Sequence, residues 1–218
     1  MKRPRICGVI TEHNQAAISD AAPKVDLFEL RLDLVGFRWT EIPRLLTKPW
    51  IATNRLAVEG GNWSGTESER TAELLRALDL GASVVDIELA AAGLNDMLPY
   101  IKTRAECLVS SHNFKATPPL GILEGIVRDE LEAGADICKV ATTALRFEDN
   151  IIILELIRRF PDKKIVALAM GEPGQPSRLL GPLAGGEFTY GALQPGKGSA
   201  PGQLTVAQLA RSFEALGL

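Results

Sequence analysis

Short runs of β-branched and other apolar residues recur along the whole chain, and segments with a helical period separate most of them. The runs long enough for a β-strand lie at residues 5–11, 25–33, 49–55, 83–89, 107–113, 136–142, 164–170 and 187–193. Each is bounded by polar residues, glycine or proline, as strands of globular proteins commonly are. The pattern therefore predicts eight strands.

The intervening segments repeat apolar residues every three or four positions, which is typical of amphipathic helices. The clearest is 66–81, which begins with a capping-box pattern at Thr66 and Glu69 and ends at Gly81. The same spacing predicts three further helices at 122–135, 147–161 and 205–217.

Eight strands that alternate with about eight helical segments in 218 residues predict an α/β fold built of right-handed βαβ units. Eight is the number of strands that closes a (β/α)8 barrel (TIM barrel), and the chain has the usual length of one. An open doubly wound sheet is the alternative, because the expected helices at 40–46 and 175–181 are short. The barrel is favoured, and residues 1–218 are predicted to form one domain, since no linker or repeat divides them.

The run at 25–33 alternates charged and apolar residues, so one face of the predicted strand carries Glu29, Arg31 and Asp33. A barrel buries both faces of a strand, under helices outside and around the axis inside. A purely structural buried ion pair stabilises little, because desolvation offsets most of the Coulomb gain. Glu29 and Arg31 are therefore predicted to face a ligand, whereas Asp33 is expected beyond the strand end and receives no role.

Lys139 lies in the middle of the apolar run 136–142. Burial of an ammonium is costly and favours the neutral amine, which is a nucleophile toward ketones and aldehydes. The alternative is a structural ion pair with Asp86 or Glu88 of the run at 83–89, and composition alone does not separate the two interpretations.

His112 favours the catalytic interpretation of Lys139. It lies near the end of the neighbouring predicted strand, so its imidazole could reach a carbon beside an imine formed on Lys139. Histidine titrates near neutral pH and can both remove and return a proton. His13, at the start of the first helical region, is interpreted as an ordinary surface or core residue.

Two glycine-rich stretches follow the seventh and eighth strands. The segment 191–199 resembles a phosphate-binding P-loop, but Gly198 stands where Ser or Thr is required, and no helix follows directly. The segments 170–181 and 196–205 are instead predicted to be loops over the barrel mouth. Their donors Arg178, Ser199 and Gln203 suit a carboxylate, which arginine can bind with two hydrogen bonds.

Composition narrows the possible partners. A net charge of −3 argues against a nucleic-acid or anionic-membrane partner, and the apolar runs are too short to span a membrane. With no signal-peptide pattern at the start, a cytoplasmic protein is expected. Cys7, Cys107 and Cys138 are widely spaced within apolar runs and are predicted to be buried, and no zinc site is expected.

Seven short motifs in order, from Val25 to Thr205, resemble type I 3-dehydroquinate dehydratase: ELRLD, TNRLAVEGG, VDIEL, SSHNF, CKVAT, MGEPGQPSR and SAPGQLT. The resemblance covers almost the whole chain, although Ser111 and Asn113 stand where many members have an aromatic residue and Asp. It implies a (β/α)8 barrel, typically a homodimer, that acts without metal or cofactor in the third step of the shikimate pathway to chorismate and the aromatic amino acids.

The resemblance also implies roles for individual residues. Lys139 forms a Schiff base with the ring ketone of 3-dehydroquinate, and His112 removes the adjacent proton and then protonates the departing hydroxyl, giving a syn loss of water. Glu59 orients the histidine. The residues that match the substrate-binding set are Glu29, Arg31 and Arg55 for the ring hydroxyls and Arg178, Ser199 and Gln203 for the carboxylate.

Two other functions compete with this one. A Schiff-base aldolase on the same barrel would act on a sugar phosphate, and such sites bind phosphate after the seventh and eighth strands. That region offers Arg178, Ser199 and Gln203, which suit a carboxylate better. A barrel that only binds a small acid would have little use for Lys139 together with His112.

Overall fold

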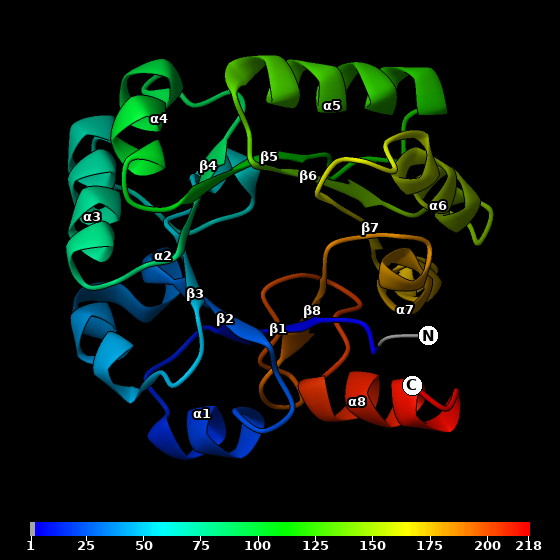
Figure 1. The fold of residues 1–218 in the computed structure, drawn as a ribbon, viewed down its shortest axis with the longest axis horizontal. Coiled ribbons are helices and arrows are strands. Elements are labelled where there is room, and N and C mark those ends of the chain that lie inside the picture. Colours follow the sequence, from blue (N-terminus) through cyan, green and yellow to red (C-terminus); the bar gives the residue numbers. More distant parts are fainter. Residues whose placement is uncertain (1–2) are drawn as a thin grey trace.

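In the computed structural model, which describes residues 3–218, eight parallel strands pair in the order β7-β6-β5-β4-β3-β2-β1-β8 (Figure 1). Their bounds are β1 (Ile6–Ile10), β2 (Leu27–Arg31), β3 (Trp50–Thr53), β4 (Val84–Glu88), β5 (Glu106–His112), β6 (Ile137–Thr143), β7 (Ile165–Met170) and β8 (Thr189–Ala192). β7 and β8 end the order without a ladder between them in the described residues, so the barrel is nearly closed. The predicted barrel is confirmed, and the open sheet is wrong.

Helices surround the barrel on the outside (Figure 1). They are α1 (Gln15–Ala21), α2 (Leu32–Val35), α3 (Glu67–Asp79), α4 (Leu94–Lys102), α5 (Leu120–Ala133), α6 (Asp149–Arg159), α7 (Gln175–Leu183) and α8 (Val206–Ala215). The short segment at 175–181 is a true helix, so the loop predicted at 170–181 is wrong from Gln175 onward. The helix expected at 40–46 consists instead of 3-10 turns, η1 (Gly36–Glu41) and η2 (Pro43–Leu45). Pro43 lacks a backbone N–H and cannot continue an α-helix from the preceding residues.

Capping side chains define the start of two helices. At α3, Glu69 N–H donates to Thr66 Oγ1 at 3.2 Å, and Thr66 N–H donates to Glu69 Oε2 at 2.8 Å. Thr205 and Gln208 form the same reciprocal pair at α8. Each box satisfies two N–H groups that a helix start would otherwise leave without partners. The capping box predicted at 66–69 is confirmed.

Apolar side chains form one cluster inside the barrel and two between the strands and the helices. The first inward positions of β2, β4 and β6, and the residue directly before β8, are all apolar: Leu27, Val84, Ile137 and Phe188. The three cysteines are buried, as predicted. The inside of the barrel is therefore a packed core at its amino-terminal end, and any ligand must enter from the opposite end.

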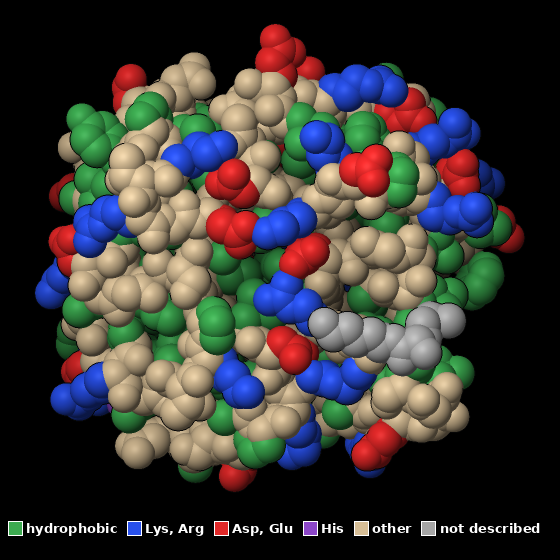
Figure 2. Space-filling model, in the orientation of Figure 1, with side chains coloured by type: hydrophobic (Ala, Val, Ile, Leu, Met, Phe, Trp, Pro, Cys, Tyr) green, Lys and Arg blue, Asp and Glu red, His purple; other side chains and the backbone are tan. Residues whose placement is uncertain are grey.

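Ion pairs cover the amino-terminal end of the barrel. Arg5 pairs with Glu187, Lys164 pairs with Glu106, and Arg3 Nη2 lies 2.7 Å from Asp26 Oδ1. Figure 2 shows acidic and basic side chains side by side across the centre of this face. None of the helices within residues 3–218 is both long enough and apolar enough to cross a bilayer.

Candidate active site

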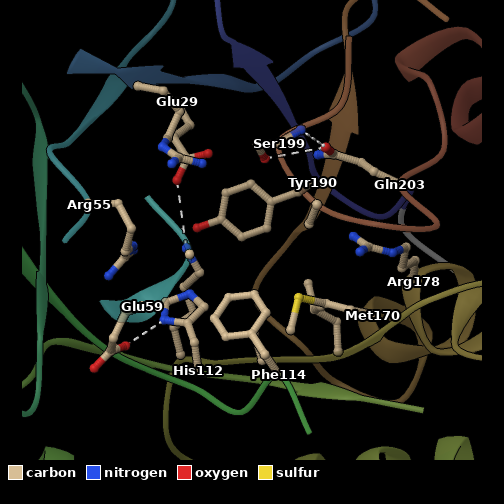
Figure 3. A pocket seen from close by; sticks show the side chains of 16 residues that line it. Glu29, Arg55, Glu59, His112, Phe114, Met170, Arg178, Tyr190, Ser199 and Gln203 are labelled. Carbon is tan, nitrogen blue, oxygen red and sulfur yellow. Dashed lines mark hydrogen bonds and ion pairs between the residues drawn. The ribbon is translucent and has the colours of Figure 1, made fainter. Parts of the chain in front are cut away.

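A cavity with about 500 Å³ of empty space opens at the carboxyl ends of the strands (Figure 3). All of the residues that the sequence predicted for the site line it: Glu29, Arg31, Arg55, Glu59, His112, Lys139, Arg178, Ser199 and Gln203. The sequence did not single out several others that line it as well: Phe114, Met170 and Tyr190. The fold thus gathers residues from 29 to 203 around one space.

The middle inward positions of the even-numbered strands form one layer of side chains, of which all but Asp86 line the cavity: Glu29 of β2, Asp86 of β4, Lys139 of β6 and Tyr190 of β8. Lys139 Nζ lies 2.9 Å from Asp86 Oδ2 and 3.6 Å from Glu29 Oε1. It also lies 4.6 Å from the centre of the Tyr190 ring. Side chains from alternate strands of a barrel share a layer, which is why residues so distant in sequence meet.

Lys139 combines the two properties that the sequence left as alternatives. It is ion-paired with Asp86, and only 6% of the residue is exposed, yet it lines the cavity. The other suggested partner, Glu88, pairs with Arg55 and Arg70 instead. The ion pair therefore holds the nitrogen at the base of the cavity without removing it from the reach of a ligand.

Asp86 is the centre of a buried network. Arg55 Nη2 lies 2.6 Å from Asp86 Oδ2, and Ser110 Oγ donates to Asp86 Oδ1 at 2.7 Å. Burial opposes ionisation of Asp86, but the charges of Arg55 and Lys139 lower its pKa well below its usual range. Burial likewise opposes the charge of Arg55, and the carboxylates of Asp86 and Glu88 raise its pKa. These groups remain charged, and they hold one another in place.

Arg70 extends this network to the loop after β3. It is fully buried, and its Nη1 donates to Glu88 Oε2 at 2.7 Å and to the Asn54 carbonyl at 3.0 Å. The other oxygen of Glu88 accepts the Leu56 N–H at 3.0 Å. The sequence did not indicate this role, because Arg70 lies on an exposed-looking part of the helical pattern. The loop that it supports carries Glu59.

His112 and Glu59 form a hydrogen-bonded pair at the rim of the layer. His112 Nδ1 lies 2.8 Å from Glu59 Oε2, which leaves Nε2 for the cavity. Burial raises the pKa of Glu59 to about 7. Burial, together with the charges of Arg55 and Lys139, lowers the pKa of His112 well below its usual value. The imidazole is therefore neutral and able to accept a proton near neutral pH.

Phe114 packs against this pair. Its ring is stacked 6.2 Å from the His112 ring at an interplanar angle of 14°. Gly60, with φ of +75°, lies beneath it, and a Cβ at that position would come within 2.2 Å of the Phe114 ring. Glycine is thus required both by the backbone conformation and by the aromatic ring next to it.

Asp33 has a role that the sequence did not indicate. It lies in α2, beyond the end of β2 as expected, and its carboxylate binds Arg31 twice, at 2.9 Å to Nε and 2.7 Å to Nη2. It also accepts the Asn62 N–H at 3.0 Å. Because two nitrogen atoms of the Arg31 guanidinium, Nε and Nη2, are held by one carboxylate, the guanidinium keeps one orientation toward the cavity. Asp33 therefore positions Arg31.

Arg178 differs from the other arginines of the cavity. It is 2% exposed and donates from Nη2 to the Pro201 carbonyl at 3.2 Å, but no carboxylate pairs with it within residues 3–218. Its buried Nε has no hydrogen-bond partner in this part of the chain. Burial lowers the pKa of Arg178 to about 10. An anionic group in the cavity would supply what this guanidinium lacks.

Ser199 and Gln203 lie on the same side of the cavity as Arg178 (Figure 3). Ser199 N–H donates to Gln203 Oε1 at 2.7 Å, which closes a short turn within the loop between β8 and α8. The Gln203 amide nitrogen and the Ser199 hydroxyl are suited to donate to a carboxylate. The described residues contain no group of three or more His, Cys, Asp or Glu side chains arranged to hold a metal ion.

His13 lies outside the cavity, as its interpretation from the sequence implies, with Nε2 3.4 Å from Glu41 Oε2. Two of the residues that sequence reasoning missed, Tyr190 and Met170, occupy inward positions of strands, so strand alternation would have marked them once the fold was known.

Comparison with known proteins agrees with this geometry. The family model described as Type I 3-dehydroquinase matches residues 6–218. The chain is 46% identical over 216 residues to a 3-dehydroquinate dehydratase of Dehalococcoides mccartyi, covering 99% of this chain and 97% of that one. It is 34% identical to the 3-dehydroquinate dehydratase of Methanosarcina mazei, covering 99% and 96% of the two chains.

A solved structure of type I 3-dehydroquinate dehydratase from Clostridium difficile, with covalently modified comenic acid, is also similar. It superposes with a TM-score of 0.86 at 25% identity and covers 99% of this chain and 93% of that one. The enzyme from Geobacillus kaustophilus gives a TM-score of 0.85, also at 25% identity, with 99% and 91% covered.

Proposed function

The chain belongs to the type I 3-dehydroquinase family, and we propose that it converts 3-dehydroquinate to 3-dehydroshikimate by syn dehydration through a Schiff base on Lys139. This reaction is the third step of the shikimate pathway. The observation that carries the proposal is the amine of Lys139 at the base of the cavity, with His112 on the adjacent strand.

Lys139 is the proposed nucleophile. In its neutral form, Nζ adds to the ring ketone, and uptake of one proton with loss of one water leaves a protonated imine that carries the positive charge on nitrogen. Asp86 and Glu29 lie beside this nitrogen and stabilise the charge. The imine then accepts the electron pair that is released when the neighbouring carbon loses a proton.

His112 is the proposed base and acid. Glu59 holds Nδ1, so Nε2 can remove a proton from the carbon beside the imine. The same nitrogen then delivers a proton to the departing hydroxyl, and use of one group on one face of the ring gives syn elimination. Hydrolysis of the imine releases product and restores Lys139. The chemistry runs on lysine and histidine and needs no metal or cofactor.

The substrate carboxylate is proposed to bind Arg178, Ser199 and Gln203. Arg178 has no ion-pair partner in the described residues, and a carboxylate would provide one in the bidentate geometry that arginine favours. The ring hydroxyls would then face Glu29, Arg31 and Arg55 across the cavity. This arrangement favours a hydroxylated acid over the sugar phosphate of an aldolase, since a single guanidinium with amide and hydroxyl donors matches a carboxylate.

We further propose a homodimer in the cytoplasm that does not bind nucleic acid. Family membership supports the dimer and the location, and the net charge of −3 supports the absence of a polyanionic partner. Light scattering coupled to size-exclusion chromatography tests the dimer, which requires twice the mass of one chain.

Borohydride trapping tests the mechanism directly. The protein is incubated with 3-dehydroquinate, the imine is reduced, and the peptide that carries the added mass is identified. We expect an adduct on Lys139 with the mass of the dehydrated product. A folded protein that turns over the substrate without forming an adduct would exclude the Schiff base, whereas an adduct with cleaved carbon–carbon bonds would indicate an aldolase.

A further inference from the structure

The aromatic ring of Tyr190 lies against the nitrogen of Lys139. The distance from Nζ to the ring centre is 4.6 Å, within the range in which the face of an aromatic ring attracts a cation. Tyr190 comes from β8 and Lys139 from β6, on the two sides of the unpaired β7–β8 junction. Figure 3 shows the ring in the middle of the cavity wall, between Glu29 and Met170.

The hydroxyl of Tyr190 does not account for this residue. It is buried and has no hydrogen-bond partner in the described part of the chain. A buried hydroxyl without a partner costs free energy rather than stabilising the fold. The ring, by contrast, is well held, because Phe188 packs edge-on against it at 5.2 Å and 81°. The contact that the structure maintains is therefore between the ring and Lys139.

The charges around Lys139 leave a place for such a contact. The titratable and charged groups around its nitrogen come from five strands and the loop after β3: Cys7, Glu29, Arg55, Asp86, His112 and Tyr190. The nearest carboxylate oxygen, Asp86 Oδ2, is shared with Arg55 Nη2, which lies closer to it, at 2.6 Å. Lys139 therefore competes with a second cation for the same oxygen. The ring offers a further attraction for which Arg55 does not compete.

We propose that Tyr190 is a positioning residue whose ring stabilises positive charge on the Lys139 nitrogen, first as the ammonium and then as the protonated imine. The second part rests on the proposed function. The amine, the ketone and a proton form the protonated imine and water. The protonated imine carries a positive charge on the same nitrogen as the ammonium does, so the ring favours both of these cations over the neutral amine. A contact of this kind changes such an equilibrium by a factor of about 2 to 30.

The ammonium is tested without substrate. The protein is labelled competitively with acetic anhydride across the neutral and alkaline range, and the Lys139 peptide is analysed by mass spectrometry. This gives the midpoint, the pH at which the reactivity of the amine reaches half of its maximum. Replacement of the ring in Y190L or Y190M removes the attraction for the cation, so the neutral amine persists to lower pH. We expect this midpoint to fall by about 0.4 to 1.5 pH units.

Two matched variants separate the ring from other effects. Y190F keeps the ring and removes the hydroxyl, and we expect it to retain the wild-type midpoint. F213L removes a buried aromatic ring of α8 in the cluster between the strands and the helices, so it controls for loosened packing and should also retain this midpoint. A midpoint unchanged in Y190L and Y190M, or shifted equally in Y190F, would overturn the proposal. Thermal unfolding shows whether each variant is folded. Because two aliphatic variants are used, Y190L and Y190M, the test still stands if one of them does not fold.

The imine is tested with 3-dehydroquinate and borohydride. At a pH above the labelling midpoint, where free Lys139 is a neutral amine, we expect the trapped fraction on Lys139 to fall about 2- to 30-fold in Y190L and Y190M and to persist in Y190F. The two failures are distinguishable. Absence of an adduct in the wild-type protein would refute the Schiff base while the labelling shift still reports on the ring. A wild-type adduct with no change in the aliphatic variants would refute the role of the ring instead.

Discussion

On the side of the cavity formed by β2, β3 and β4, each buried charge has a partner of opposite sign, whereas Arg178 on the α7 side has none within residues 3–218. Arg31 pairs with Asp33, and Arg55 pairs with Asp86 and Glu88. Both sides are almost equally buried. The difference lies in whether the protein itself supplies the counter-charge.

This contrast separates two tasks. The paired side is complete before a ligand arrives, so it fixes the positions of Lys139 and the groups around it. The α7 side contains a guanidinium whose burial is costly until an anion binds. One side of the cavity is thus preorganised, while the other gains most of its stabilisation from the ligand. The following experiments test this division, from the largest expected effect to the smallest.

Loss of the proposed nucleophile should have the largest effect. K139M removes the amine from the paired side, and we expect kcat/KM to fall on the order of 10³-fold or more. K164M is the matched control, because Lys164 pairs with Glu106 at the opposite end of the barrel, away from the cavity. Steady-state assays of both variants measure the effect. Retention of more than a tenth of the activity in K139M would contradict the assigned role.

Replacing an arginine on each side should change stability in different ways. R55M leaves Asp86 and Glu88 without their partner, and we expect the free energy of unfolding to fall by about 3–5 kcal/mol. R178M removes a buried charge that has no carboxylate partner, so the ligand-free protein should keep its stability or gain some. Urea unfolding of both variants gives the comparison. Equal destabilisation by the two substitutions would refute the division into two sides.

The same arginine should matter for binding. R178Q is expected to raise KM about 10- to 100-fold with a smaller change in kcat, since a charge-assisted pair with the substrate carboxylate is lost. R178K keeps the charge but lacks the planar guanidinium, so its KM should lie between those of the wild-type protein and R178Q. R211Q, on the outer surface of α8, serves as the control. An unchanged KM in R178Q would place the carboxylate elsewhere.

The pH dependence should be the mildest effect. Because burial raises the pKa of Glu59 to about 7, this carboxyl group loses its negative charge as the pH falls through that value. The hydrogen bond between Glu59 and His112 Nδ1 then weakens, so kcat/KM should decrease below about pH 7, by at most tenfold per pH unit. In E59Q the side chain cannot ionise, so the decrease of kcat/KM below about pH 7 (the acidic limb) should vanish, and the overall activity should be lower. A limb that persists in E59Q would have to come from another group.

The local pattern was sufficient for most of the architecture. Each predicted strand is present within a few residues of its expected bounds, because inward and outward positions are both buried and both demand apolar or β-branched side chains. Motif order likewise singled out Lys139, His112 and Arg178, which the fold brings together around one cavity. The segment 40–46 failed because its apolar spacing suits a helix, whereas Pro43 divides it into two short turns.

The sequence by itself determined the eightfold alternation, the capping box at Thr66 and the residues gathered at the mouth. Only the tertiary structure decided which charges would meet. That Arg70 supports the loop of Glu59 and that the Tyr190 ring faces Lys139 depend on the packing of elements distant in the sequence. Electrostatic and aromatic contacts act over a few ångströms between residues as distant in sequence as Asp86 and Lys139, and a one-dimensional pattern holds no such distance.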